Sequence, residues 1–129
     1  MLYPRVPGDG KNNDSLVLYG VFYKTKFLFT GDLEEEGEIT LLNDYPSLSV
    51  DVLKVGHHGS KTSSSKSFIK SIQPKIALIS CGLNNRYRHP NQETLDTFQN
   101  EQVSIYRTDK QGAIKFQKNG KSWHIKTVK

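Results

Sequence analysis

Residues 52–65, VLKVGHHGSKTSSS, hold a short apolar run that ends in two adjacent histidines between two glycines. Residues 50–55 have the composition of a short buried strand. A run of hydroxyl side chains around Lys61 follows, and Ser63 or Ser64 is placed to cap a helix over residues 63–72. The segment therefore predicts a strand, a turn that carries two imidazoles, and a helix.

Strand and helix patterns alternate through the middle of the chain, and strand pairs stand at both ends. This order is typical of the α/β class, with a mixed sheet and helices on one face. Residues 1–14, rich in Pro, Gly, Asn and Asp, are expected to be an irregular leading segment. No linker divides the rest, so we expect residues 1–129 to form a single unit. The expected strands are 15–23, 26–30, 50–55, 75–80, 103–106, 113–117 and 123–128, with turns at 24–25, 111–112 and 119–120, and the expected helices are 33–42, 63–72 and 92–100.

The composition excludes several classes of protein. A single cysteine, Cys81, excludes an internal disulfide and a cysteine-rich zinc site. No window approaches the roughly 20 apolar residues of a membrane-spanning helix, and residues 1–10 lack the pattern of a signal peptide. The net charge of +5 indicates either a polyanionic partner such as nucleic acid or a basic surface that keeps the protein in solution. Positive charges near the histidine pair and in the last third of the chain favour the first.

Metal-binding side chains follow three of the expected strands. Asp32 follows the strand at 26–30, His57 and His58 follow the strand at 50–55, and His89 ends the loop after the strand at 75–80. Loops at strand ends can aim side chains from distant positions at one point. A carboxylate and imidazoles suit Zn²⁺, and also Mn²⁺ or Fe. A bound ion would supply hydroxide and, with a second ion, stabilise both oxygens of an in-line displacement at phosphorus.

Each of these residues also has a structural interpretation. Asp32 could cap the acidic helix that follows it, the histidine pair could be ordinary turn residues, and His89 could be a loop residue before Pro90. The hydroxyl segment could cradle a phosphate or could be a polar helix cap. The candidate phosphate-binding and substrate-binding residues are Ser60, Lys61, Thr62, Ser63, Asn84, Asn85, Arg86 and Tyr87.

The chain resembles a known family through five motifs in a fixed order: NDSLVL, FLFTGDL, DVLKVGHHGSKTSSS, ISCGLNNRYRHP and YRTDKQGAI. They run from about residue 12 to residue 114 and resemble the C-terminal metallo-β-lactamase-like domain of the ComEC competence protein family. The resemblance implies an αββα sandwich fold and a divalent metal cofactor, Zn or Mn. It also implies a nuclease that acts on DNA, single-stranded by expectation, as a soluble domain of a bacterial cell-membrane protein for DNA uptake.

The resemblance also implies residue roles. Asp32 corresponds to a metal-bridging carboxylate and His89 to a late metal ligand. One of His57 and His58 corresponds to a ligand of the other ion, or lies beside the attacked phosphate as an acid or an electrostatic stabiliser. Successive residues leaving a strand point in different directions, so the two histidines are not expected to share one role. Asp32, His57 and His58 are thus the expected catalytic residues.

One motif of the family is missing. The resemblance implies an early histidine-rich and aspartate-rich motif that supplies most metal ligands, but no histidine precedes His57. We therefore expect the chain to be the C-terminal half of the domain, to hold one ion or none, and to be weakly active alone. Its expected partners are the N-terminal half of the same domain, the membrane channel and, through an exposed sheet face, a second copy of itself.

Two other functions fit the same residues. A metallo-hydrolase of this fold could act on a small molecule, such as a lactone or a choline-phosphate ester. A non-catalytic nucleic-acid-binding module would instead use the positive charge alone, and its binding would depend steeply on salt.

Overall fold

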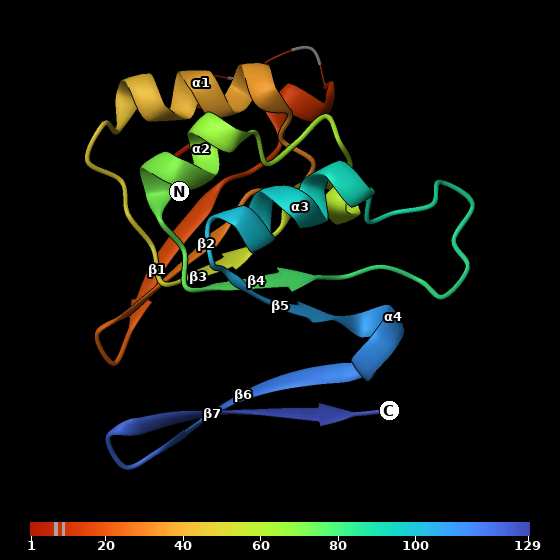
Figure 1. The fold of residues 1–129 in the computed structure, drawn as a ribbon. Helices are drawn as coiled ribbons and strands as arrows, with labels where there is room; N and C mark the ends of the chain where they lie inside the picture. The colour runs from red at the N-terminus through yellow and green to blue at the C-terminus, as the bar shows by residue number, and fades with distance from the viewer. Residues whose placement is uncertain (7, 9) are drawn as a thin grey trace.

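A five-stranded sheet forms the centre of the computed structural model, which describes residues 1–6, 8 and 10–129. Helices α1, α2 and α3 cover one face of this sheet, and a separate hairpin lies on the other side (Figure 1). The elements in chain order are η1 (Asn12–Asp14), β1 (Leu18–Phe22), β2 (Thr25–Phe29), α1 (Glu35–Asp44), β3 (Val52–Lys54), η2 (Gly56–Gly59), α2 (Lys66–Ile72), β4 (Ile76–Ile79), α3 (Gln92–Asn100), β5 (Ser104–Arg107), α4 (Thr108–Gln111), β6 (Ala113–Asn119) and β7 (Ser122–Val128). The predicted α/β class, a mixed sheet with flanking helices, is confirmed.

The order of the strands places the predicted site residues at one edge of the sheet. The strands lie in the order β1-β2-β3-β4-β5, with β1 antiparallel to β2 and the other pairs parallel. The carboxyl ends of β2, β3 and β4 therefore lie together, because parallel neighbours finish at the same edge. The segments that follow these three strands carry Asp32, the histidine pair and His89.

The core lies between the sheet and the helices. Leu28, Leu53 and Ala77 come from neighbouring strands and are almost fully buried, as is the apolar face of α2. That face has the spacing predicted for one side of a helix. Burial of these side chains against one sheet face fixes the helical layer and leaves the carboxyl ends of the strands open for loops. The buried apolar residues of α2 are Phe68, Ile69 and Ile72.

Aromatic side chains attach the β6–β7 hairpin to the opposite face of the sheet. The ring of Phe27 in β2 lies 5.8 Å from Phe116 and 5.9 Å from Trp123, in edge-to-face geometry. Tyr23 also meets Trp123, at 6.3 Å. Gly112 allows the chain to enter this hairpin: its φ is +72°, and a Cβ there would lie 2.0 Å from the carbonyl oxygen of Val128.

Several predicted boundaries were wrong by one to three residues. The turn expected at 24–25 lies at Tyr23 and Lys24, both with positive φ, because this conformation matches the twist of the two strands. Of the turn expected at 111–112, Gln111 is the last residue of a one-turn helix, α4, and Gly112 follows that helix. The capping residue of α2 is Ser65, not Ser63 or Ser64, and its Oγ accepts from the N–H of Phe68 at 3.3 Å.

In its described residues the leading segment holds one short helix, η1, and Tyr3 forms a bridge with Val17. Residues 7 and 9, which belong to the predicted irregular segment 1–14, lie outside the described residues. Among the residues that the structure describes, no helix is long and apolar enough to cross a membrane.

Candidate functional site

The two histidines lie in a strained turn rather than in an extended loop. His57 has φ 47° and His58 has φ 55°, both in the left-handed region, where each non-glycine residue costs about 1–2 kcal/mol. Backbone hydrogen bonds hold the turn: the N–H of His57 donates to Gly31 and that of Ser60 donates to His57, both at 2.9 Å. The first bond ties the turn to the segment that follows β2, so the surrounding structure holds the backbone that carries both imidazoles.

Gly59 allows this turn to pack against the segment after His89. Its φ is +83°, and a Cβ there would lie 2.5 Å from the Cβ of Pro90. The N–H of Asn91 also donates to the carbonyl of Gly59 at 2.9 Å. Any side chain at position 59 would push the two segments apart. Glycine at this position is therefore what lets His57 and His89 approach each other.

The rings of His57 and His89 are neighbours, with centroids 5.7 Å apart and an interplanar angle of 76°. The Nδ1 atom of His57 is buried and makes no hydrogen bond. It lies 3.8 Å from Oε1 of Glu34. A buried ring nitrogen without a partner is costly, because it has lost its water. The structure thus brings two of the predicted site residues together and leaves one ring atom unsatisfied.

His58 has different surroundings. Its Nδ1 lies 2.7 Å from the carbonyl oxygen of Ser80 at the end of β4. A carbonyl only accepts, so Nδ1 carries the proton and Nε2 keeps its lone pair in the neutral ring. A backbone carbonyl in this place is the usual partner of a metal-binding histidine. The different partners of His57 and His58 agree with the expectation that they do not share one role, which stays a prediction.

His89 is held at the end of the loop that follows β4. Its N–H donates to Oδ1 of Asn85 at 2.8 Å, and its ring stacks on Tyr87 with centroids 5.8 Å apart. Burial lowers the pKa of His89, and the nearby rings of His57 and His58 lower it further. The lowered pKa keeps the imidazole neutral, the state that can bind a metal. The side chain of Asn85 shapes this loop by donating to the carbonyls of Gly82 and His89, and its predicted contact with substrate stays a prediction.

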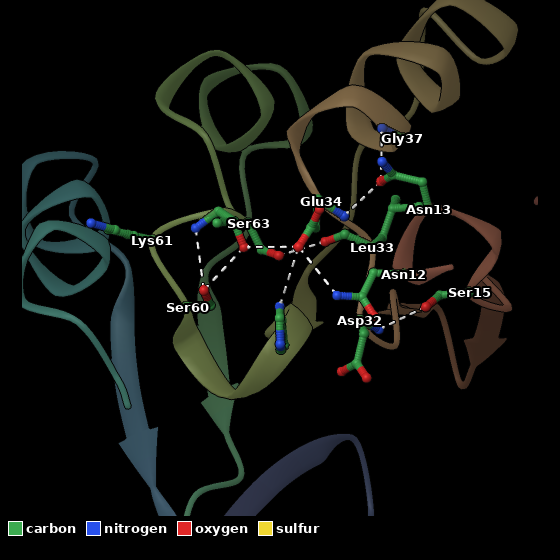
Figure 2. A network of polar contacts seen from close by, with 12 residues as sticks. Asn12, Asn13, Ser15, Asp32, Leu33, Glu34, Gly37, Ser60, Lys61 and Ser63 are labelled. Atoms are coloured by element: carbon green, nitrogen blue, oxygen red, sulfur yellow. Dashed lines mark hydrogen bonds and ion pairs between the residues drawn. The ribbon is translucent and has the colours of Figure 1, made fainter. Parts of the chain in front are cut away.

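Asp32 lies at the same edge of the sheet but is exposed. Its N–H donates to Oγ of Ser15 at 3.0 Å, while its carboxylate points away from the network around Glu34 (Figure 2). The interpretation of Asp32 as the cap of α1 is wrong. Asn13 supplies that cap from another segment, because its Oδ1 accepts from the N–H groups of Glu34 and Gly37 at 3.0 and 3.2 Å. The Asp32 carboxylate is therefore left for another partner.

Lys54 at the end of β3 is a charged residue that the sequence analysis did not select. Burial lowers the pKa of its ammonium group, and the negative charge of Asp32 opposes this shift. Its Nζ donates to the carbonyl of Val55 at 3.2 Å. The sequence signal that could have identified Lys54 was a lysine inside the apolar run VLKV, residues 52–55. The site edge thus contains a half-buried cation near Asp32.

Glu34 is the second residue that the sequence analysis missed. Its Oε1 accepts from Nδ2 of Asn12 at 3.2 Å and from the hydroxyl of Thr62 at 3.3 Å, besides facing His57 (Figure 2). One carboxylate therefore joins the leading segment, the hydroxyl segment and the histidine turn. No local pattern separates Glu34 from the two glutamates after it, because its role comes from contacts distant in the sequence.

The hydroxyl segment is largely bonded to the protein itself. Ser60 and Ser63 are buried; the Ser63 hydroxyl donates to the carbonyl of Leu33, and Ser60 and Thr62 share a hydrogen bond of 3.0 Å. The buried carboxyl group of Glu38 accepts from the N–H groups of Ser64 and Ser65, and burial raises its pKa. These contacts explain why α2 begins later than predicted. Only Lys61 and Thr62 of the predicted cradle are exposed.

The loop residues Arg86 and Tyr87 are exposed, with the Arg86 guanidinium 5.9 Å from the Tyr87 ring. The ring of Tyr87 stacks on the ring of His89. Arg86 and Tyr87 both belong to the loop that ends at His89. Their contact with a substrate remains a prediction.

The residues fit a metal ion in kind but not in number. Imidazoles with a free Nε2 and a nearby carboxylate are suitable ligands for zinc, which takes at least three protein ligands. Within residues 1–6, 8 and 10–129, however, no group of three or more His, Cys, Asp and Glu side chains could hold a metal ion. The described residues therefore provide part of a ligand set, centred on His57 and His89.

Comparison with known proteins identifies the class. Residues 5–83 match the metallo-beta-lactamase superfamily, which covers more than half of the 129 residues. The chain belongs to this superfamily, whose members are typically metal-dependent. The α/β fold and the strand-end position of the histidines agree with this assignment.

Within the superfamily, the chain is related to competence proteins. It is 47% identical over 117 residues to ComE operon protein 3 of Bacillus subtilis, covering 90% of this chain and 15% of that protein. It is 38% identical over 115 residues to competence protein ComA of Neisseria gonorrhoeae, covering 85% of this chain and 17% of that protein. It is 31% identical over 104 residues to recombination protein 2 of Haemophilus influenzae, covering 81% of this chain and 13% of that protein. The resemblance to the ComEC family is confirmed, and the chain spans less than a fifth of these relatives.

Proposed function

We propose that this domain is part of a metal-dependent hydrolase that cleaves the phosphodiester backbone of DNA during DNA uptake. The observation that carries this proposal is the approach of His57 and His89 at the edge of the sheet that also holds Asp32. The similarity to competence proteins supports DNA as the substrate. We also place the domain outside the bilayer, as a soluble part of a larger membrane protein.

The proposed ligands are His57, His89 and Asp32, with His58 presenting its Nε2 beside them. A bound divalent ion, Zn²⁺ or Mn²⁺, would supply a nucleophilic hydroxide near neutral pH. The half-buried Lys54 and the exposed Lys61 add positive charge where a phosphate would approach. A charge held in a partly desolvated place acts more strongly on an anion than one in water.

The described residues provide too few metal ligands, and this determines the activity expected of the chain alone. The two predicted partners, the N-terminal half of the same domain and the membrane channel, belong to the proposed parent protein. The N-terminal half would complete the ligand set that the described residues leave unfinished. The chain alone is therefore expected to cleave DNA weakly or not at all.

The experiment compares the complete parent domain with this chain on a single-stranded oligonucleotide, with Mn²⁺ or Zn²⁺ and with a chelator. Cleavage by the complete domain should be lost with the chelator and in the variants His57→Ala and Asp32→Asn. Asp96→Asn is the matched control, since Asp96 lies on α3 and, among the described residues, accepts a hydrogen bond from Gln92 alone. Unchanged cleavage in both site variants would reject the proposal. Hydrolysis of a lactone or a bis-aryl phosphate, with no cleavage of DNA, would favour a small-molecule hydrolase.

A further inference from the structure

The positive charge of the chain is concentrated in the β6–β7 hairpin. Residues 110–129 contain six lysines and no acidic residue, whereas residues 1–109 contain 12 basic and 13 acidic residues. Residues 110–129 therefore account for the net charge of +5, and four of the six lysines, Lys115, Lys118, Lys121 and Lys126, lie in the hairpin itself. This segment lies across the sheet from the helical layer that carries the glutamates of α1 (Figure 1).

The hairpin has two chemically different faces. Its aromatic side chains pack against Phe27 on the sheet. The alternate positions are all exposed, and apart from the last pair, Ala113 and Val128, they are polar. Those polar positions are Lys115, Gln117 and Asn119 on β6 and Ser122, His124 and Lys126 on β7.

Two lysines lie directly opposite each other on the exposed face. Lys115 pairs with Lys126 in the strand register, next to the pair formed by Gln117 and His124. Directly opposed like charges destabilise a pair of strands. Among the described residues, no ion pair joins a carboxylate to either lysine. The ammonium groups of these two lysines therefore repel each other, and an anion bound between them would relieve this repulsion.

We infer that this exposed face of the hairpin binds the phosphate backbone of a nucleic-acid strand. Two ammonium groups at one level of the ribbon, beside amide, hydroxyl and imidazole side chains, suit phosphate oxygens. A membrane surface is a poorer match, because membrane-binding faces place large apolar side chains beside their positive charges. Apart from Val128 at the far end, this face has none. The inference concerns a surface separate from the histidine turn and does not depend on hydrolysis.

The test measures fluorescence anisotropy of a labelled single-stranded 20-mer with this chain, in chelator so that no metal-dependent cleavage occurs. The double variant Lys115→Gln/Lys126→Gln should weaken binding about tenfold at low salt. It should also reduce the slope of log K against log salt by about 1.4, because two phosphate contacts are lost. The matched control is Lys66→Gln/Lys70→Gln, which removes the same charge from the exposed side of α2 and should change binding much less.

A single variant separates binding from folding. Lys115→Glu places a carboxylate opposite Lys126, so it should stabilise the hairpin while weakening DNA binding. The fluorescence of Trp123, the only tryptophan, reports the state of the hairpin. A folding defect would instead lower both the stability of the hairpin and the affinity for DNA.

Three results would overturn the inference. The first is an equal loss of binding in the α2 control, and the second is no measurable binding of the 20-mer at low salt. The third is tighter binding to vesicles containing anionic phospholipid than to DNA, with the same sensitivity to the lysine variants. Loss of DNA cleavage in the complete domain, with this metal-free binding intact, would reject only the proposed hydrolysis.

Discussion

The histidine turn and the β6–β7 hairpin are attached to the same sheet by different interactions. The turn is held by backbone hydrogen bonds and by polar side chains such as Glu34, whose partners come from three separate segments. The hairpin is held by the edge-to-face contacts of Phe27 with Phe116 and Trp123. Hydrogen bonds fix the orientation of the groups that they join, whereas aromatic packing holds two surfaces together with less strict orientation. The site chemistry and the basic face should therefore respond independently to mutation.

The largest expected effect is the loss of stability when a glycine is replaced, compared between the two regions. Gly59→Ala should destabilise the protein by about 3 kcal/mol, since it adds a clash with Pro90 to left-handed strain. Gly120→Ala in the hairpin turn has a similar φ of +63° but open space around it, so it should cost about 1 kcal/mol. Urea unfolding followed by circular dichroism measures both. Equal losses would show that the packing of the turn on Pro90 contributes nothing.

Phe27→Ala tests the attachment of the hairpin. Truncation removes the ring that contacts both Phe116 and Trp123, at a cost of about 2 kcal/mol because Phe27 is only half-buried. Trp123 fluorescence should then shift to the red at a lower urea concentration than the loss of helical circular dichroism. Coincident transitions would mean that the hairpin and the sheet unfold as one unit.

The next effect is a pH dependence at the start of the hairpin. Arg107 bonds Asp109 through two hydrogen bonds of 2.7 and 3.0 Å, and these bonds hold the pKa of Asp109 below its usual range. The pair therefore stabilises the fold at neutral pH, and this contribution of about 1 kcal/mol is lost as the pH falls through the lowered pKa. Asp109→Asn should unfold more easily than the wild type at about pH 7, with the difference shrinking toward about pH 2. A difference that does not change with pH would argue against the ion pair, and Asp96→Asn is the control.

The smallest effect on stability, below about 0.5 kcal/mol, is expected for Glu34→Gln, which keeps the shape of the side chain and removes its charge. The informative readout is the proton position on His57, seen in the nitrogen chemical shifts of its ring. With Glu34 present, Nδ1 should carry the proton, and the amide should reduce that preference. Glu35→Gln, at the exposed first residue of α1, is the matched control. An identical ring spectrum in both variants would exclude Glu34 as the residue that orients His57.

Local patterns predicted the elements of the fold well. The alternation of strands and helices and the apolar spacing of α2 gave the right class, because they depend on burial against one sheet face. The boundaries failed where distant residues intervened. Glu38 binds the N–H groups of Ser64 and Ser65, so the helix cap moved to Ser65.

The site was only partly predictable for the same reason. The sequence analysis selected His57 and His89, which the fold brings together, because each lies in a loop that follows an expected strand. It could not select Glu34, because the environment of that residue comes from contacts between segments far apart in the chain. It passed over Lys54, although a lysine inside the apolar run VLKV marked that position. It interpreted the segment that contains Ser60 and Ser63 as a phosphate cradle or a polar helix cap, and in the fold both side chains are buried.

The single cysteine lies where the loop of His89 leaves β4. The backbone N–H of Cys81 donates to the Thr108 hydroxyl, which in turn donates to the carbonyl of Cys81, both at 2.9 Å. Burial raises the pKa of the Cys81 thiol, so little reactive thiolate is present at neutral pH. Cys81 is the only cysteine of the sequence, so an alkylating reagent that labels thiols can react only there. The rate of labelling therefore measures how often this loop opens. Slower labelling on addition of zinc or an oligonucleotide would reveal closure of the loop over its ligand.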